Sequence, residues 1–192
     1  MLYTTLNRLR ENEAYPERVP ELANYAPDEP IPLTRILETC GLLAALRTLC
    51  ATTTPWKVDR LVGSLACDLA EHFLPLFKDW HPNDDRPQRA IETARRCLRG
   101  EATRGEVIAT LRGAFEASWE AEREADNTPY DGGVARDASY AADEAARAAA
   151  TVAGIHEFPT SVFNLIDSVS EKDKWMSECF VKLLETSDEK ED

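Results

Sequence analysis

HPNDDRPQRAIETARRCLRGE, residues 81–101, carries the clearest helix start and stop signals in the chain. Asp84 or Asp85 can accept hydrogen bonds from the free amides of a first helical turn, and either charge suits the positive end of a helix. Pro87 lies near that turn, where its missing N–H does no harm. Gly100 is placed to stop the helix in the left-handed conformation. The stretch therefore predicts one amphipathic helix, with an apolar face formed by Ala90, Ile91, Ala94, Cys97 and Leu98.

The same stretch gathers the residue types that acid–base chemistry uses. A histidine, two aspartates and an arginine lie within six residues and could form a catalytic group. Each also has a structural reason to be there, because the aspartates cap a helix and His81 suits the end of the preceding helix. We interpret the set as a structural motif and keep a small enzyme using His81, Asp84 and Arg86 as an alternative. The motif consists of His81, Asp84, Asp85, Arg86, Pro87 and Glu92.

The rest of the chain is also patterned for helices. No segment alternates with period two, so we predict an all-α fold of six to eight helices in a single compact helical bundle. Five prolines between residues 16 and 32 block helix there and predict a Pro-rich N-terminal arm. We divide the chain into residues 1–32 (a helix and this arm), 33–155 (the helical core) and 156–192. The last part is expected to be a helical extension packed on the core, with an acidic, disordered end.

Several helix limits follow from local signals. Residues 2–12 are predicted as a short helix, and residues 33–51 as one buried helix that tolerates Gly41. Thr103 and Glu106 form a T-x-x-E capping box that starts another helix. That helix is expected to turn Val107, Ile108, Leu111, Phe115 and Trp119 inward. An Ala-rich helix follows and is expected to end at Gly154.

Acidic residues are concentrated in the second half of the chain. The net charge is −13, yet residues 1–112 hold 16 acids and 15 bases, whereas residues 113–192 hold 19 acids and 7 bases. Such a surface repels nucleic acid and attracts a basic protein or nucleoprotein complex, so we expect no direct binding of nucleic acid. Solubility alone is the other interpretation. The predicted acidic face consists of Glu116, Glu120, Glu122, Glu124, Asp126, Asp137, Asp143 and Glu144.

Other chemistries find little support in the sequence. The three histidines form no HExxH or HxxxH pair, the five cysteines form no CxxC, and neither GxSxG nor a phosphate-binding glycine loop occurs. We therefore expect no metal, no cofactor and no enzymatic activity, and five buried free thiols. No apolar run reaches the length of about 18 residues that a membrane helix needs. With no secretory signal at its start, the chain is predicted to be cytoplasmic. The sequence leaves open whether it forms a homodimer.

Residues 81–101 resemble a signature of an immunity-protein family from bacterial polymorphic toxin systems. In that signature His-Pro-x-Asp-x-Arg-Pro precedes Ala-Ile-Glu and, further on, Gly-Glu. The matching residues are His81, Pro82, Asp84, Arg86, Pro87, Ala90, Ile91, Glu92, Gly100 and Glu101. The resemblance covers about residues 35–155 and implies a helical fold and a partner-binding role. The N-terminus, with DEPIPLTRIL at residues 28–37, is instead similar to uncharacterised helical proteins of phages and prophages.

Two binding functions are consistent with these observations. The first is an inhibitor that docks on a target protein through its acidic helical face, in the manner of an immunity protein. The second is a phage-encoded inhibitor of a host defence system, of the anti-CRISPR or DNA-mimic type, which would use the same face on a different target. The first accounts for the longer resemblance and the second for the N-terminal one.

Overall fold

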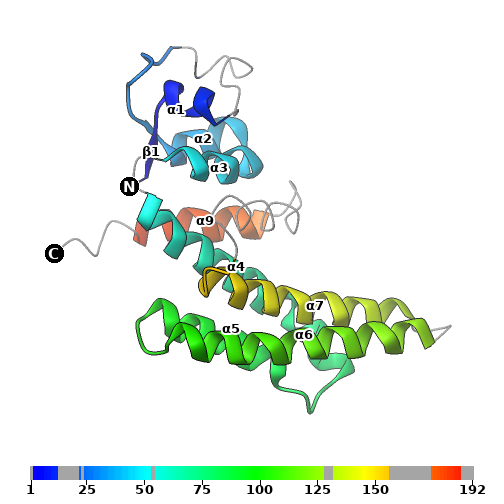
Figure 1. Cartoon of the computed structure of the whole chain (residues 1–192). Helices are drawn as coiled ribbons and strands as arrows, with labels where there is room; N and C mark the ends of the chain where they lie inside the picture. The colour runs from blue at the N-terminus through cyan, green and yellow to red at the C-terminus, as the bar shows by residue number, and fades with distance from the viewer. Residues whose placement is uncertain are drawn as a thin grey trace. The chain divides into compact units, whose positions relative to one another are not determined.

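The computed structural model describes residues 2–12, 22, 24–52, 55–127, 132–155 and 174–186. Within them lie eight α-helices, one short 3-10 helix and two strands of two residues each, so the prediction of an all-α fold with six to eight helices is confirmed (Figure 1). The helices are α1 (Leu6–Glu11), α2 (Leu33–Cys40), α3 (Leu42–Thr48), η3 (Leu49–Ala51), α4 (Pro55–Trp80), α5 (Arg86–Leu98), α6 (Arg104–Asn127), α7 (Gly132–Val152) and α9 (Lys174–Thr186). The strands are β1 (Tyr3–Thr4) and β2 (Ile31–Pro32).

Contacts within the chain define two compact units. Met1–Val62 and Glu157–Asp192 form the first unit, and Gly63–His156 form the second. The boundary falls inside α4, which begins at Pro55 as its proline predicts. The domain limits predicted at residues 32/33 and 155/156 stay a prediction, because a grouping of contacts describes packing and not independent folding.

In the first unit, the N-terminal segment is not one helix, as predicted, but a strand followed by a helix. Tyr3 pairs with Pro32 and Thr4 with Ile31 in an antiparallel ladder. The hydroxyl of Thr4 also donates to the carbonyl of Ala51, at 2.8 Å. Helix α1 begins only at Leu6, because the side chain of Thr5 caps it. These long-range bonds hold the first residues in extended geometry and outweigh their helical spacing.

Gly41 separates two helices where a single helix was predicted. Its φ of 83° lies in the left-handed region that favours glycine, so α2 ends at Cys40 and α3 begins at Leu42. The amide of Gly41 still donates to the carbonyl of Leu37, at 3.0 Å. Of the predicted Pro-rich arm, residues 13–21 and 23 lie outside the described residues, as does the acidic end of the chain.

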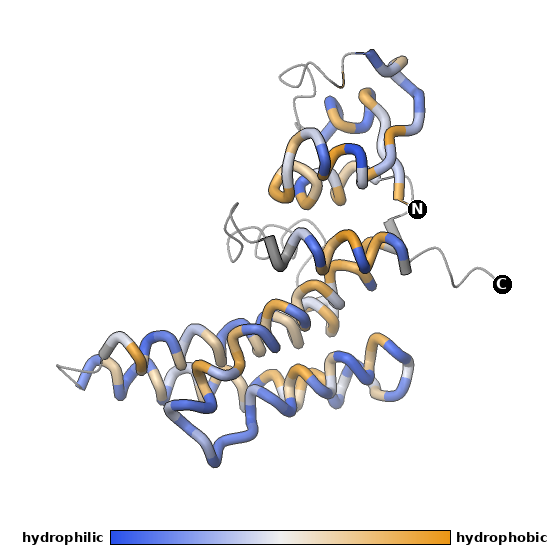
Figure 2. Tube along the Cα trace, turned by 180° about the vertical axis from the view of Figure 1, so that it is seen from behind, coloured by the Kyte–Doolittle hydropathy of each residue, from blue (hydrophilic) through white to orange (hydrophobic). Residues whose placement is uncertain are grey.

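The second unit is built around alanine. The second half of α4 and helices α5, α6 and α7 contribute to its core, and most buried positions on α7 are alanines. Figure 2 shows how apolar and polar residues alternate along these helices. Small side chains let helix axes approach closely, and the spacing is tight at Gly63. A Cβ atom added there would lie 3.1 Å from the side chains of both Leu98 and Val152.

The inward face of α6 differs from the prediction. Val107 and Leu111 are buried, as expected, and Phe115 is half-buried. Ile108 and Trp119 face outward, with 40% and 56% of their surfaces exposed, so their prediction as core residues was wrong. The buried line of α6 continues instead through small residues: Ala114, Ala117, Ser118, Ala121 and Ala125.

The predicted helix ends in this unit are confirmed where local chemistry sets them. Gly100 and Gly154 have φ angles of 79° and 59°, and each follows the end of a helix. Thr103 and Glu106 form the reciprocal capping box: the amide of Thr103 donates to the Glu106 carboxylate at 2.8 Å, and the amide of Glu106 donates to the Thr103 hydroxyl at 3.2 Å.

Candidate functional site

The turn between α4 and α5 is organised by Asp84 and Arg86. Asp84 accepts from the backbone amide of Arg86 at 3.0 Å, and from Nε and Nη2 of the same guanidinium at 3.0 Å and 2.7 Å. Partial burial raises the pKa of Asp84, but the hydrogen bonds from Arg86 outweigh this effect and hold the pKa below its usual range. Asp85 occupies the cap position without a side-chain cap bond, so Asp84 supplies the local acceptor.

Arg86 also ties α5 to α6. Its Nη2 donates to the carboxylate of Glu120, and this bond, together with Asp84, raises the pKa of the guanidinium. Hydrogen bonding from Arg86 lowers the pKa of Glu120 in return. The aliphatic stem of Arg86 passes Gly113, where an added Cβ atom would lie 3.7 Å from three of its carbons. The arginine therefore bridges a carboxylate on its own turn and one on the neighbouring helix.

A second set of contacts joins the end of α4 to α6. The indole N–H of Trp80 donates to the carboxylate of Glu124 at 2.9 Å, and Nε2 of His81 lies 3.6 Å from the same oxygen. The ring of His81 also packs on Phe77, with 5.0 Å between the ring centroids. Lys78 donates to the backbone carbonyl of Asp84 at 3.1 Å.

This arrangement does not favour a role of these residues in acid–base catalysis. A general base needs a free carboxylate or imidazole within reach of a substrate proton. The carboxylate of Asp84 is ion-paired in a fork, and the low pKa that results makes it a weak base. His81 faces an aromatic ring and the carboxylate of Glu124. Three of the motif residues, His81, Asp84 and Arg86, are thus brought together in a joint between three helices, which supports their interpretation as structural.

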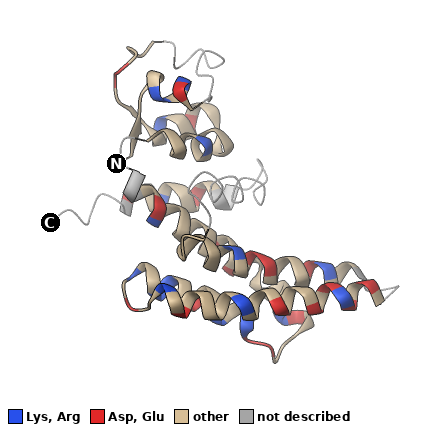
Figure 3. Ribbon diagram, viewed as in Figure 1, with Lys and Arg blue, Asp and Glu red and all other residues tan. Residues whose placement is uncertain are grey.

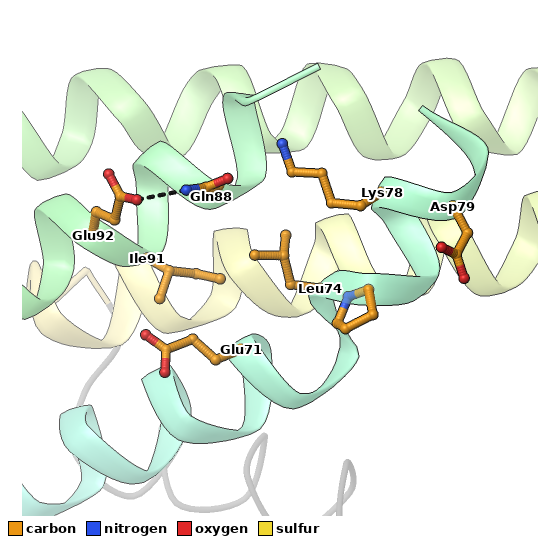
Figure 4. Close-up of a pocket in the computed structure, with 8 residues that line it drawn as sticks. Glu71, Leu74, Lys78, Asp79, Gln88, Ile91 and Glu92 are labelled. Atoms are coloured by element: carbon orange, nitrogen blue, oxygen red, sulfur yellow. Dashed lines mark hydrogen bonds between the residues drawn. The ribbon is translucent and has the colours of Figure 1, made fainter. Parts of the chain in front are cut away.

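A separate cleft lies between α4 and α5 within the second unit (Figure 4). Its volume is about 490 Å³. Leu74 and Ile91 approach each other across its apolar floor. Of the predicted motif, Glu92 lines the cleft and accepts a hydrogen bond from Gln88 at 2.7 Å. Sequence reasoning missed this cleft, because α4 and α5 each read as ordinary amphipathic helices and their relative placement is a property of the fold.

One acid on the rim of the cleft is held by an arginine of α5. Arg95 donates from Nε to Glu71 at 2.6 Å and from Nη2 to Asp68 at 2.5 Å. From the sequence, Arg95 is expected near the negative end of its helix and paired with a nearby acid, but the partner itself is not specified. A pairing across 24 or 27 residues leaves no periodic signal in the sequence.

The predicted acidic face divides into three groups. Glu120 and Glu124 are engaged by the joint described above, and Asp143 pairs with Arg147 at 2.7 Å. Glu144 is buried, with 4% of its surface exposed, so it is not available on a solvent-facing surface. The remaining residues are exposed and form no hydrogen bond or ion pair with any described residue; we call them the four unpaired acids: Glu116, Glu122, Asp126 and Asp137. Figure 3 shows the acidic and basic residues distributed along α6 and α7.

The five cysteine side chains differ in burial, whereas all five were predicted to be buried. Cys67 is fully buried, and burial raises its pKa to about 12. The other four thiols are only half-buried, which corrects the prediction of five buried thiols: Cys40, Cys50, Cys97 and Cys179. In the part of the chain that the structure describes, no group of three histidine, cysteine or acidic side chains has a geometry suited to a metal ion. No helix there combines the length and apolar character needed to cross a membrane.

The second unit, Gly63–His156, coincides with the part of the chain that a known family model matches. The family model described as "Imm-5 like putative immunity protein" matches residues 59–157, which is just over half of the chain. The chain therefore belongs to the Imm-5-like immunity-protein family, and the resemblance noted in its sequence is confirmed. The match includes the joint, the cleft and the four unpaired acids. No curated protein and no solved structure matches the chain.

Proposed function

We propose that this protein binds a toxin and blocks it by docking, without catalysis, through the outer surface of α6 and the first turns of α7. Membership of the immunity-protein family supports a toxin as the kind of partner. The observation that carries the docking surface is the presence of the four unpaired acids on these two helices. An acid that serves only to hold the fold together is normally paired, as Glu120 and Asp84 are.

The local charge supports a basic partner. Residues 114–127 hold five acids and one base. Exposed charges of one sign steer a partner of opposite sign during encounter and raise the association rate, an effect that salt screens over about 8 Å at physiological ionic strength. The toxin is therefore expected to present a basic surface, such as a cleft that handles nucleic acid, and this protein is expected to cover it.

The test is co-expression with the protein encoded by the gene next to this one. Growth inhibition by that protein, relieved by this chain, is the expected result. Association and dissociation rates are then measured by surface plasmon resonance at about 50 mM salt, below the physiological value, and at about 500 mM salt, above it. Association should slow by at least about 10-fold at the higher salt.

A matched pair of variants assigns the effect to the surface. The test variant neutralises three of the unpaired acids: Glu116→Gln, Glu122→Gln and Asp126→Asn. The control removes the same charge from exposed acids elsewhere, which also have no described partner: Glu11→Gln, Asp59→Asn and Glu185→Gln. Only the test variant should slow association. Equal effects of both variants would contradict the proposed surface, and toxicity that the chain does not relieve would contradict the function.

A further inference from the structure

An apolar line runs along the outer surface of α6. Ile108, Phe115 and Trp119 are seven and four residues apart, which places them on the same face of the helix. We call these three residues the α6 stripe. Ile108 and Trp119 are well exposed, and Phe115 is half-buried. The rings of Phe115 and Trp119 stack, with 6.3 Å between centroids and 26° between planes.

Most of the α6 stripe lies outside the core, because Ile108 and Trp119 are exposed and only Phe115 packs against buried residues. The buried line of the same helix, through Val107, Ala114 and Ala121, is offset from the stripe by roughly 100–140° around the helix axis. An exposed tryptophan does not stabilise a fold through burial, and exposed apolar side chains that gather on one face mark interaction sites. Stacking on Phe115 restricts the indole of Trp119 before any partner arrives, which lowers the conformational entropy lost on binding.

Unpaired acids frame the aromatic pair. Glu116 and Glu122 lie three residues before and three residues after Trp119, one helical turn away on either side. Asp126 lies seven residues, or two helical turns, after Trp119 on the same face. Arg112 and Arg123 are the bases nearest to this face in sequence, and acids outnumber them. The surface therefore combines an apolar centre with a mostly negative rim, which is the usual arrangement of a protein–protein hot spot.

We propose that the α6 stripe is the anchor of the toxin interface, and that Trp119 inserts into an apolar pocket that basic residues surround on the partner. This inference rests on the proposed function and adds to it the residues that hold the complex together. A second copy of this chain fits the surface poorly, because a symmetric contact through α6 would place Glu116, Glu122 and Asp126 of both copies against one another. Nucleic acid is disfavoured by the same charges.

The experiment measures dissociation of the neighbouring gene's product from three variants of the full chain. Trp119→Ala should speed dissociation by at least about 30-fold, because hot-spot aromatics dominate complex lifetimes. Leu76→Ala and Val134→Ala are matched controls, since each truncates an exposed apolar side chain on another helix; both should dissociate like the wild type. Thermal unfolding of Trp119→Ala should match the wild type, which excludes a folding defect as the cause.

The possible failures are distinguishable. Wild-type binding with salt-sensitive association, together with unchanged dissociation of Trp119→Ala, would overturn the anchor and leave the proposed function intact. Absence of wild-type binding would overturn both. Sedimentation of the chain alone gives a further check, because a dimer that Trp119→Ala dissociates would assign the α6 stripe to self-association and overturn its role in binding the toxin.

Discussion

Replacing Arg86 with methionine tests whether the joint between α4, α5 and α6 stabilises the fold. Methionine keeps the apolar stem that passes Gly113 but removes the guanidinium, so the substitution isolates the ion pairs from the packing. Asp84, whose side chain is only 20% exposed, would lose the fork that holds it. Glu120 is 53% exposed and would return to water at little cost.

The magnitude follows from this difference in exposure. A hydrogen bond to a charged group contributes about 1.5–3 kcal/mol where its partner is left partly buried, whereas exposed pairs contribute about 0–1 kcal/mol. Arg86→Met should therefore lower the free energy of unfolding by about 2 kcal/mol. With a denaturant slope of about 2 kcal/mol per molar urea, the midpoint should fall by about 1 M. The control is Arg89→Met, because Arg89 is exposed and lies 3.9 Å from the exposed Asp85. It should shift stability by about 0.5 kcal/mol or less.

The pH dependence gives this prediction a second readout. The pKa of Asp84 in the folded protein lies below its ordinary value of 3.8, so the folded state binds the proton less readily than the unfolded state. The resulting stabilisation is complete above the unfolded pKa and is lost as the pH falls through the folded pKa. The difference between wild type and Arg86→Met should therefore be constant at neutral pH and shrink below about pH 4. Equal midpoints for Arg86→Met and Arg89→Met at pH 7 would refute the reasoning.

Three further outcomes are expected. In the folded protein at pH 8, Cys67 should resist a thiol-specific reagent while the half-buried thiols react. Mass spectrometry of the labelled chain measures this difference. Rapid labelling of Cys67 would mean that the second unit opens readily. In a urea titration, Gly63→Leu should lower the free energy of unfolding by about 1–3 kcal/mol, because the added side chain meets close neighbours. Gly133→Leu is the control, since its side chain meets open space, and it should change the free energy of unfolding far less. Gly100→Ala should destabilise the fold by about 1 kcal/mol because its φ is 79°, and Gly105→Ala, inside a helix, should be neutral or stabilising; the opposite order in calorimetry would contradict the backbone argument.

The features that sequence predicted well are those set by neighbours in the chain. Gly100 and the pair Thr103–Glu106 act within one helical turn, so their residue types alone specify a stop and a start. Gly41 was misread because a glycine inside an apolar pattern is compatible with a continuous helix or with a break. The choice between them depends on how the flanking helices pack, and here α2 and α3 pack against each other as separate segments.

The candidate site was only partly predictable for the same reason. The sequence placed Asp84 and Arg86 in one turn, but the bond from Arg86 to Glu120 spans 34 residues and depends on α5 lying beside α6. The acidic residues were grouped by composition alone, and their role as a partner-binding face stays a prediction. Their division into paired, buried and unpaired members required the structure, as Glu144 illustrates. Local patterns fix elements, and long-range packing decides which of their polar groups remain free.

The alanine core connects the fold to the exposed tryptophan. Because buried positions of α6 and α7 are largely alanine, the two helices pack closely, and the large buried ring among these alanines, Phe77, comes from α4. On α6 itself, Phe115 is half-buried at the edge of the core and stacks on Trp119, which is well exposed. The exposed part of Trp119 contributes little to folding and adds an apolar patch that solubility alone would disfavour. Under the proposed function, a partner covers this exposed side chain. The close packing of α6 and α7 also holds Trp119 and its acidic neighbours on a rigid helix, as the proposed docking role requires.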